Sequence, residues 1–307
     1  MANITGDGNF TSKLNQVLSS PPADIIEFFS TLNIFLSVTP SLGNVLLLVA
    51  LHRVTSIYPP NKLFFRCLTI TDLGVGILVQ PLYVTDMLAT FKNMNVNARR
   101  SISDARCVSS LILCGVSLLT SAAISVDRLL AVLLGLRYRH VVTLRRVRVV
   151  IICVWLVGVF LGSMIMFRGA IALKAASALV PLLLVISIYC YTRIFHKLRH
   201  QEAQVRDHIP QHQANGGGNS LNIARYKNSV SCVSWVQLAL VACYAPWSIV
   251  CVLPVSGMEN RVARLVAETL VYFNSSLNPI LYCWKIRAVR QAVKDARRQL
   301  NCLNFFK

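Results

Sequence analysis

Seven apolar stretches, each long enough to cross a bilayer, constrain this 307-residue chain more than any other feature. A hydrocarbon core of about 30 Å needs about 20 apolar residues in a helix. Within lipid, helices satisfy every backbone polar group, whereas open sheets do not. We therefore expect an all-α membrane protein, a seven-transmembrane helix bundle. The expected spans lie near residues 28–52, 63–88, 105–134, 147–168, 175–199, 226–254 and 262–284.

The composition agrees with this class and leaves little chain for a second domain. Charged residues make up 14% of the chain and hydrophobic residues 55%, whereas a soluble domain carries about 25% charged residues. The bundle is expected over residues 28–284, after an N-terminal tail at 1–27. Residues 285–307 place Ile286, Val289 and Val293 on one face of a basic stretch. This pattern predicts a short amphipathic eighth helix on the inner face, with a plain basic tail as the alternative.

The net charge of +19 is distributed as in a membrane protein. With the N-terminus outside, the inner segments hold 22 of the 31 Lys and Arg residues, which is the positive-inside pattern. The tail also carries two glycosylation sequons, at Asn3 and Asn9, which require an outside location. We expect a multi-pass plasma-membrane protein with an outside N-terminus, contacts with anionic membrane lipids, and no nucleic-acid partner. Cys302, beside basic residues, is a candidate palmitoylation site, with a free thiol as the alternative.

Several spans carry polar residues at similar depth. Asp72 lies well inside the second span, where an aspartate costs about 2.5–3.5 kcal/mol unless a bundle interior shelters it. At ~1.5 Å per residue, Asn44, Ser117 and Asn278 reach comparable levels. A carboxylate with hydroxyl and amide oxygens suits a hard cation such as Na⁺. A structural hydrogen-bond network without an ion is an equally weighted alternative.

Two further patterns indicate a bundle that can change its conformation. Pro181, Pro246 and Pro279 each remove a backbone hydrogen bond within a span. Asp127 and Arg128 close the third span at its inner end, where opposite charges can pair with each other and then with a partner.

At these residues the chain resembles the rhodopsin-like (class A) G-protein-coupled receptors. The resemblance covers roughly residues 28–300, and the motifs fall in the family's helices and order. The matching segments are Gly43-Asn44, Leu68 to Asp72, Asp127-Arg128-Leu129, Trp155, Pro181 with Tyr189, Cys243-Tyr244-Ala245-Pro246 and Asn278-Pro279-Ile280-Leu281-Tyr282.

The resemblance implies roles for individual residues. Allosteric Na⁺ would bind at Asp72, with no other cofactor, in a sodium pocket formed by Asp72, Ser117, Asn274, Ser275 and Asn278. The switch that admits a G protein would use Asp127, Arg128, Tyr189 and Tyr282. The implied partners are an extracellular ligand and a heterotrimeric G protein, with arrestin as a further candidate.

Departures from the family pattern leave the subfamily unassigned. Tyr244 replaces the usual tryptophan, Ser121 a leucine and Leu240 a phenylalanine, so we expect a weaker apolar lock and raised basal activity. Tyr226 stands where an acid would pair with Arg128. The expected second outer loop is nearly absent and offers Cys107 no disulfide partner. This last feature resembles the melanocortin receptors, in the wider group with adenosine and lipid receptors.

Candidate ligand-binding residues lie at the outer ends of the spans. Ser110 occupies the position where amine receptors carry an aspartate, so an aminergic receptor is not expected. The last span has no lysine between Arg264 and Lys285, which excludes a retinal protein. The candidates are Tyr83, Asp86, Asp104, Arg106, Ser110, Tyr244 and Glu268.

The predicted function is that of a receptor rather than an enzyme, since no nucleophile–base–acid set appears. Its ligand would be a peptide or a small or lipid-like molecule, and ligand binding would shift a conformational equilibrium. Two alternatives stay open at this point. One is a non-signalling seven-helix receptor or scaffold, and the other is an ion-coupled transporter that uses Asp72.

Overall fold

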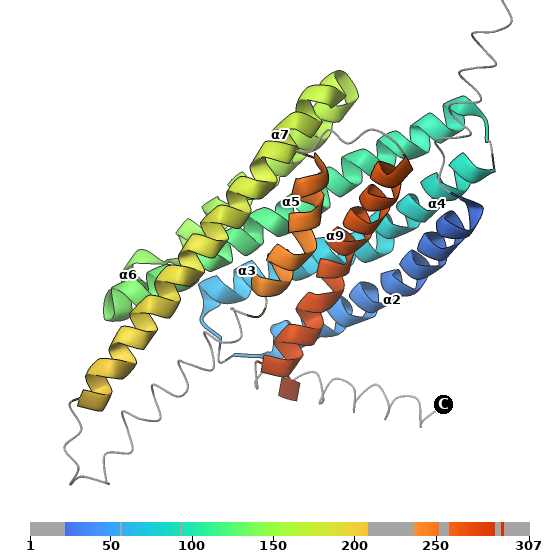
Figure 1. The fold of residues 1–307 in the computed structure, drawn as a ribbon. Helices are drawn as coiled ribbons and strands as arrows, with labels where there is room; N and C mark the ends of the chain where they lie inside the picture. The colour runs from blue at the N-terminus through green and yellow to red at the C-terminus, as the bar shows by residue number, and fades with distance from the viewer. Residues whose placement is uncertain are drawn as a thin grey trace, which may run out of the picture.

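The helices of this protein form one bundle (Figure 1). The structure is a computed structural model that describes residues 22–55, 57–92, 94–207, 235, 237–251, 258–285 and 290–291. Within these residues the main elements are helical, and their bounds are α2 (Ala23–Arg53), α3 (Pro59–Gly74), η1 (Val75–Val79), α4 (Gln80–Phe91), α5 (Val96–Leu134), η2 (Gly135–Arg137), α6 (Tyr138–Val141), α7 (Leu144–Asp207), the helix Gln237–Cys251, and α9 (Met258–Lys285).

These helices make seven passes. The first is α2, the second is α3, η1 and α4 together, and the third is α5. The long helix α7 folds back on itself at Arg168, whose φ of −144° and ψ of 61° are not helical, and so supplies two antiparallel passes (Figure 1). Helix Gln237–Cys251 and α9 complete the bundle. Four of the described helices are long and apolar enough to cross a membrane by length and composition, namely Ala23–Arg53, Pro59–Phe91, Val96–Val141 and Leu144–His200.

Local sequence explains where several helices begin, widen and end. Pro59 and Pro60 occupy the first turn of α3, where a missing N–H is tolerated. The Asn95 side chain caps α5 by accepting a bond from the Asn97 N–H, and Gly135 follows its last residue with a positive φ of 50°. The π-helical turn η1 lies just before Pro81, which has no N–H for the regular helical ladder.

The helix ends differ from those expected from hydropathy. The first helix starts at Ala23, inside the expected tail 1–27, and the third starts at Val96 rather than 105. Residues 169–174, expected as an outer connection, are helical. The fifth expected span ends at residue 199, whereas α7 continues to Asp207. Hydropathy marks the part of a helix inside the bilayer, whereas polar residues continue the same helix in water.

Some expectations lie outside the described residues. These are the sequons at Asn3 and Asn9, the residue Tyr226, the basic face of the eighth helix and the cysteine Cys302.

The interior is divided into two apolar clusters with polar residues between them. The cluster toward the start of α2, which we call outer, includes Phe29, Val75 and Tyr272. The cluster toward the end of α2, which we call inner, includes Leu47 and Leu68. Along α2, α3 and α9, the residues Asn44, Asp72 and Asn274 to Asn278 fall between members of the two clusters. Many large apolar side chains point outward instead, such as Phe35, Leu42 and Phe160. This is the surface expected of a bundle that lies in lipid.

Candidate functional site

Asp72 is the centre of the polar layer. Its side chain is completely buried. The hydroxyls of Ser117 and Ser275 donate to Asp72 Oδ1 at 3.0 and 2.8 Å, and Asn278 Nδ2 donates to Oδ2 at 2.6 Å. The donors come from α5 and α9, while Asp72 lies on α3. The structure therefore brings four of the five expected pocket residues together around one carboxylate.

Two asparagines extend this layer. Asn44 Nδ2 on α2 donates to the carbonyls of Pro40 and Ser275, at 2.8 and 3.2 Å. Asn274, the fifth expected residue, is buried but does not bond to Asp72. Its Oδ1 and Nδ2, and the Oδ1 of Asn44, lack hydrogen-bond partners among the described residues. The family resemblance, not sequence depth, implied Asn274 as a pocket residue, and the structure buries it in this layer without a hydrogen bond to the carboxylate.

The donor set of this layer fits Na⁺. Hard cations take oxygen ligands, and the layer offers a carboxylate, two hydroxyls and two amide oxygens that are buried without partners in the described part of the chain. A single carboxylate also matches a single positive charge.

The contact between α2 and α9 is close at this depth. A Cβ on Gly43 would lie 3.0 Å from the side chain of Pro279, so glycine lets the two helices approach beside the polar layer. The bonds from Asn33 to Thr269 and from Thr39 to Ser276, followed by the contact of Gly43 with Pro279, advance together along both helices. The two helices are therefore parallel, and the start of α2 and the end of α9 lie at opposite ends of the bundle (Figure 1).

A second polar cluster lies at the inner end of α5. The hydroxyl of Tyr138, on α6, donates to Asp127 Oδ1 at 2.8 Å, and Arg128 Nη2 lies 3.5 Å from Asp127 Oδ2. The amide of Asn61 on α3 completes the cluster. The amide is oriented so that its nitrogen donates to Asp127 Oδ2 at 3.2 Å and to the Tyr138 hydroxyl at 2.9 Å. In this orientation the amide oxygen accepts from Arg128 Nη2 at 2.8 Å.

The other two expected switch residues lie on α7 and α9. Tyr189, on the second arm of α7, is 58% exposed, and no hydrogen bond joins it to Arg128 within the described residues. Tyr282 is buried and packs its ring against Phe65 with centroids 5.1 Å apart. The structure therefore groups Asp127 with Arg128 and leaves Tyr189 largely exposed.

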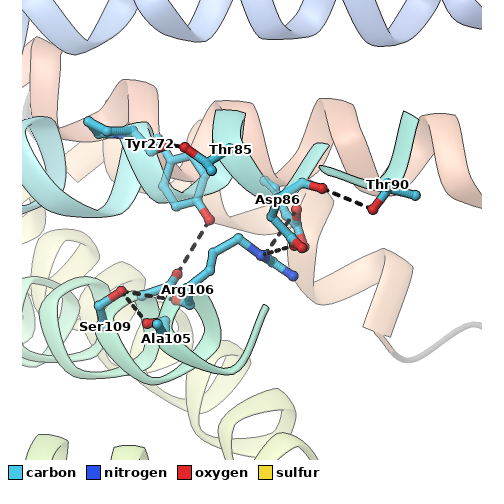
Figure 2. A network of polar contacts seen from close by, with 10 residues as sticks. Thr85, Asp86, Thr90, Ala105, Arg106, Ser109 and Tyr272 are labelled. Atoms are coloured by element: carbon cyan, nitrogen blue, oxygen red, sulfur yellow. Dashed lines mark hydrogen bonds and ion pairs between the residues drawn. The ribbon is translucent and has the colours of Figure 1, made fainter. Parts of the chain in front are cut away.

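The outer end of the bundle holds a charge cluster of three side chains from three helices. Arg106 Nε on α5 lies 2.7 Å from Asp86 Oδ2 on α4, and Arg106 Nη1 lies 3.6 Å from Glu268 Oε2 on α9. These side chains are 16%, 16% and 13% exposed. Figure 2 shows Arg106 reaching across from α5 to Asp86. The structure thus brings together two of the expected ligand-binding acids around one guanidinium.

An aromatic layer lies next to the charge cluster. The Tyr83 and Tyr272 rings meet edge to face at 5.2 Å, and the Arg106 guanidinium lies 5.7 Å from the Tyr83 ring centre. The Ser110 and Tyr272 hydroxyls are 3.5 Å apart, and Tyr272 lies beside Arg106 in Figure 2. Tyr244 is buried, and its hydroxyl donates to the Cys114 carbonyl at 3.3 Å. The buried hydroxyl of Tyr244 is thus satisfied by a backbone carbonyl of α5.

Asp104 does not join the charge cluster. It lines a cleft of about 570 Å³ between η1, α5 and the first arm of α7, together with Leu78 and Met166. Leu78 and Met166 are 48% and 63% exposed, so the cleft opens to the outside of the bundle.

Sequence reasoning missed three residues that the structure assigns to these clusters. They are Asn61 in the inner cluster, Tyr272 in the aromatic layer and Gln237, which bonds to Ser125 across two helices. Tyr272 and Gln237 are polar residues within apolar stretches, and this signal could have identified them, whereas Asn61 lies between Pro60 and Lys62 just before the expected second span. Asp86 and Glu268 were expected as ligand-binding residues from the sequence, but their pairing with Arg106 was not.

Known proteins are similar in sequence over most of the chain. Residues 43–174 and 168–282 match the 7 transmembrane receptor (rhodopsin family). The chain is 26% identical to the adenosine receptor A3 of Ovis aries over 291 residues, which cover 86% of this chain and 87% of that receptor. It is 27% identical to the histamine H2 receptor of Cavia porcellus over 302 residues, 89% of this chain and 79% of that receptor.

The histamine H2 receptor of Homo sapiens is similar to the same degree, 27% over 289 residues, which cover 85% of this chain and 75% of that receptor. The matched region contains Asp72, Arg128, Arg106, Glu268 and Tyr282, so it includes the polar layer and both end clusters.

Proposed function

This chain belongs to the rhodopsin family of seven-transmembrane receptors, and we propose that its extracellular ligand is recognised through a cationic group at the outer charge cluster. As a member of this family it is a G-protein-coupled receptor and not an enzyme. The relatives are receptors named for two different ligands, adenosine and histamine. Their names alone therefore do not choose a ligand for this chain.

The charge cluster carries the proposal. Two acids, Asp86 and Glu268, share one guanidinium, so the three side chains together carry a net charge of −1. The side chains are partly exposed, and Arg106 makes one short and one long contact. A ligand ammonium or guanidinium competes with Arg106 for the same carboxylates. The contact of Arg106 with Glu268 is the longer and weaker of the two, so the ligand replaces it more easily. The ligand class is a cationic small molecule or a peptide with a basic group.

The residues below the charge cluster are neutral, and this indicates how deeply the cationic group of the ligand enters the bundle. Ser110, one turn deeper than Arg106 on α5, faces the Tyr272 hydroxyl and offers no charge. Tyr244 lies deeper still and bonds to the backbone. A cation is therefore recognised above the aromatic layer, at Asp86 and Glu268, rather than in the middle of the bundle.

Signalling follows from differential binding to two arrangements of the helices. Arg106 ties α5 to both α4 and α9. A ligand that takes over either acid changes the contacts that hold these three helices at their outer ends. Below them, Asp72 joins α3, α5 and α9. A ligand shifts such an equilibrium by as much as its affinity differs between the two states, and a G protein at the inner end shifts it reciprocally.

The remaining partners are part of the same proposal. Bound Na⁺ at Asp72 would supply positive charge to the buried carboxylate, which the hydroxyls of Ser117 and Ser275 orient. Arrestin and anionic lipids would contact the basic inner segments, which hold 22 of 31 Lys and Arg residues when the N-terminus is outside. That N-terminal orientation also puts the charge cluster on the extracellular side, since Phe29 of α2 and Tyr83 of α4 belong to the same outer apolar cluster.

The experiment screens ligands sorted by charge against purified receptor in lipid nanodiscs, with nucleotide exchange on a panel of heterotrimeric G proteins as the readout. Asp86→Asn and Glu268→Gln should each weaken cationic hits by about tenfold or more, as expected for loss of a charge-assisted contact of about 1.5–3 kcal/mol. Arg106→Gln should strengthen the same hits, because it removes the internal competitor. Glu27→Gln, at an exposed acid on α2, is the matched control.

The opposite pattern would contradict the proposal. If the hits are anionic, and Arg106→Gln abolishes them, the guanidinium and not the acid pair is the recognition group. If no G protein exchanges nucleotide with any ligand, the non-signalling scaffold is favoured. An electrogenic current in a bilayer would favour the transporter.

A further inference from the structure

We propose that the lipid-facing cleft beside Asp104 is a second binding site, which takes an amphiphile with a cationic head group and an aliphatic tail. The cleft lies between η1, α5 and the first arm of α7, on the outside of the bundle. It is therefore distinct from the charge cluster of Arg106, Asp86 and Glu268, which lies between α4, α5 and α9.

The geometry of α5 separates the two sites. Asp104 and Arg106 are two residues apart, which turns their side chains by about 200° around the helix axis. Arg106 accordingly points toward Asp86 and Glu268, while Asp104 lines the cleft with Val108. A ligand that reaches Asp104 from the membrane has no need to enter the bundle.

The close packing of α5 and α7 forms the inner boundary of the cleft. A Cβ on Gly162 would lie 2.4 Å from the Ile112 side chain, so the helices touch there through glycine. Met166 comes one turn after Gly162 and lines the cleft, as Ile112 does. The helices thus meet at Gly162 and leave a space of about 570 Å³ toward the outer end.

The walls of the cleft determine the chemistry of its occupant. The apolar side chains are Leu78, Val108, Ile112, Leu113 and Met166. Ser101, Asp104 and Ser109 supply the polar groups. From Ser101 to Leu113 the helix runs about 18 Å, which suits a chain that lies along it with its head group toward the outer end.

Charge complementarity selects the head group. Asp104 makes no ion pair among the residues that the structure describes, although Arg100 lies one turn before it. Within a bilayer, an aliphatic tail gains little by moving from lipid to protein, because lipid tails are as apolar as leucine. Selectivity therefore rests on Asp104, which attracts an ammonium and repels a carboxylate or phosphate.

Photolabelling tests this site without any need for signalling. The probe is hexadecylamine with a diazirine on its chain, applied to the full receptor in phosphatidylcholine nanodiscs. Matched probes are the alcohol and the fatty acid with the same chain. We expect the amine to label the α5 segment from Val108 to Leu113 about tenfold more than either matched probe. A tenfold ratio lies between the effect of an ion pair in bulk water and the effect of an ion pair near a protein surface.

Three variants and one control make the result decisive. Asp104→Asn should reduce amine labelling to the level of the alcohol, whereas Asp104→Glu should preserve it. Ala105→Phe, which fills the cleft, should reduce labelling by all three probes. Glu27→Gln should change nothing, because this exposed acid lies on α2.

Equal labelling by amine, alcohol and acid, unchanged in Asp104→Asn, would show ordinary bilayer contact and overturn the proposal. Should Asp104→Asn fail to fold, the ratio of amine to alcohol labelling in the wild type and in Asp104→Glu still decides the question. Labelling that moves with Asp86→Asn instead would place the amine at the charge cluster and also overturn it.

Discussion

The Ser125 hydroxyl on α5 lies 2.9 Å from the side-chain oxygen of Gln237, on the helix Gln237–Cys251. Both residues are buried. The single hydroxyl proton is shared with the Ser121 carbonyl, also at 2.9 Å. Ser121 and Leu240, expected to weaken an apolar lock, lie near this polar contact along their helices. A hydrogen bond thus links the two helices where the family pattern has an apolar contact.

Ser125→Ala should weaken this link and raise ligand-free nucleotide exchange. It leaves the Gln237 oxygen without its partner, and buried unsatisfied groups cost about 1–3 kcal/mol. Polar contacts between membrane helices couple by about 0.6 kcal/mol on average and about 1.7 at most, so the lost coupling should fall in that range. The measurements are thermal unfolding in nanodiscs and basal exchange on a responsive G protein.

The control for this variant is Ser163→Ala, whose exposed hydroxyl bonds within its own helix to the Phe160 carbonyl. The double variant Ser125→Ala with Gln237→Leu should recover stability, because both polar partners are then gone. Basal exchange equal to wild type in Ser125→Ala would show that the bond does not restrain the helix Gln237–Cys251.

Asp72→Asn should abolish stabilisation by Na⁺. The wild-type receptor should melt at a higher temperature in sodium chloride than in choline chloride at the same ionic strength, since a ligand that binds only the folded state stabilises it. The variant removes the charge that attracts the ion. It also places an amide NH₂ near Asn278 Nδ2, which donates to Asp72 in the wild type. A wild-type melting temperature that is the same in both salts would remove the ion from this account.

Gly158→Ala should destabilise the contact between α5 and α7. A Cβ at this position would lie 2.5 Å from Val116 Cγ2, and valine has little freedom to move in a helix. Overpacking of this kind costs about 1–3 kcal/mol, and thermal unfolding would measure it. Gly115→Ala is the matched control, because nothing lies within 4 Å of its added Cβ. Equal melting temperatures for the two variants would show that the helices separate without cost.

Tyr138→Phe should loosen α6 while leaving its aromatic packing in place. The variant removes the bond from the Tyr138 hydroxyl to Asp127, worth about 1.5–3 kcal/mol for a charged acceptor when fully buried and less at this partly exposed site. The ring still packs against Tyr58, with centroids 5.9 Å apart. Hydrogen exchange should report faster amide exchange in residues 138–142. Tyr58→Phe, which removes the bond to the Val142 carbonyl, is the comparison, and unchanged exchange in both would contradict the role of these hydroxyls.

The depth of polar residues could be predicted from the sequence, because a helix rises by a fixed amount per residue. This is why Asp72, Ser117 and Asn278 were expected at comparable levels, while Ser275 was implied by the family resemblance. The structure places Ser117, Ser275 and Asn278 in contact with Asp72. The direction of each side chain could not be predicted, because it depends on how each helix is rotated about its axis. Asp104 and Arg106 were expected in one site, but they lie on opposite sides of α5.

The sequence alone determined the class of protein, the number of membrane passes and the level of the buried carboxylate. These follow from the cost of polar groups in lipid and from the length of an apolar helix. Only the tertiary structure decided which partners share Arg106, that Asn61 lies beside Asp127, and that Gln237 meets Ser125. Such contacts join residues far apart in the chain, and helix packing, which fixes both rotation and approach, brings them together.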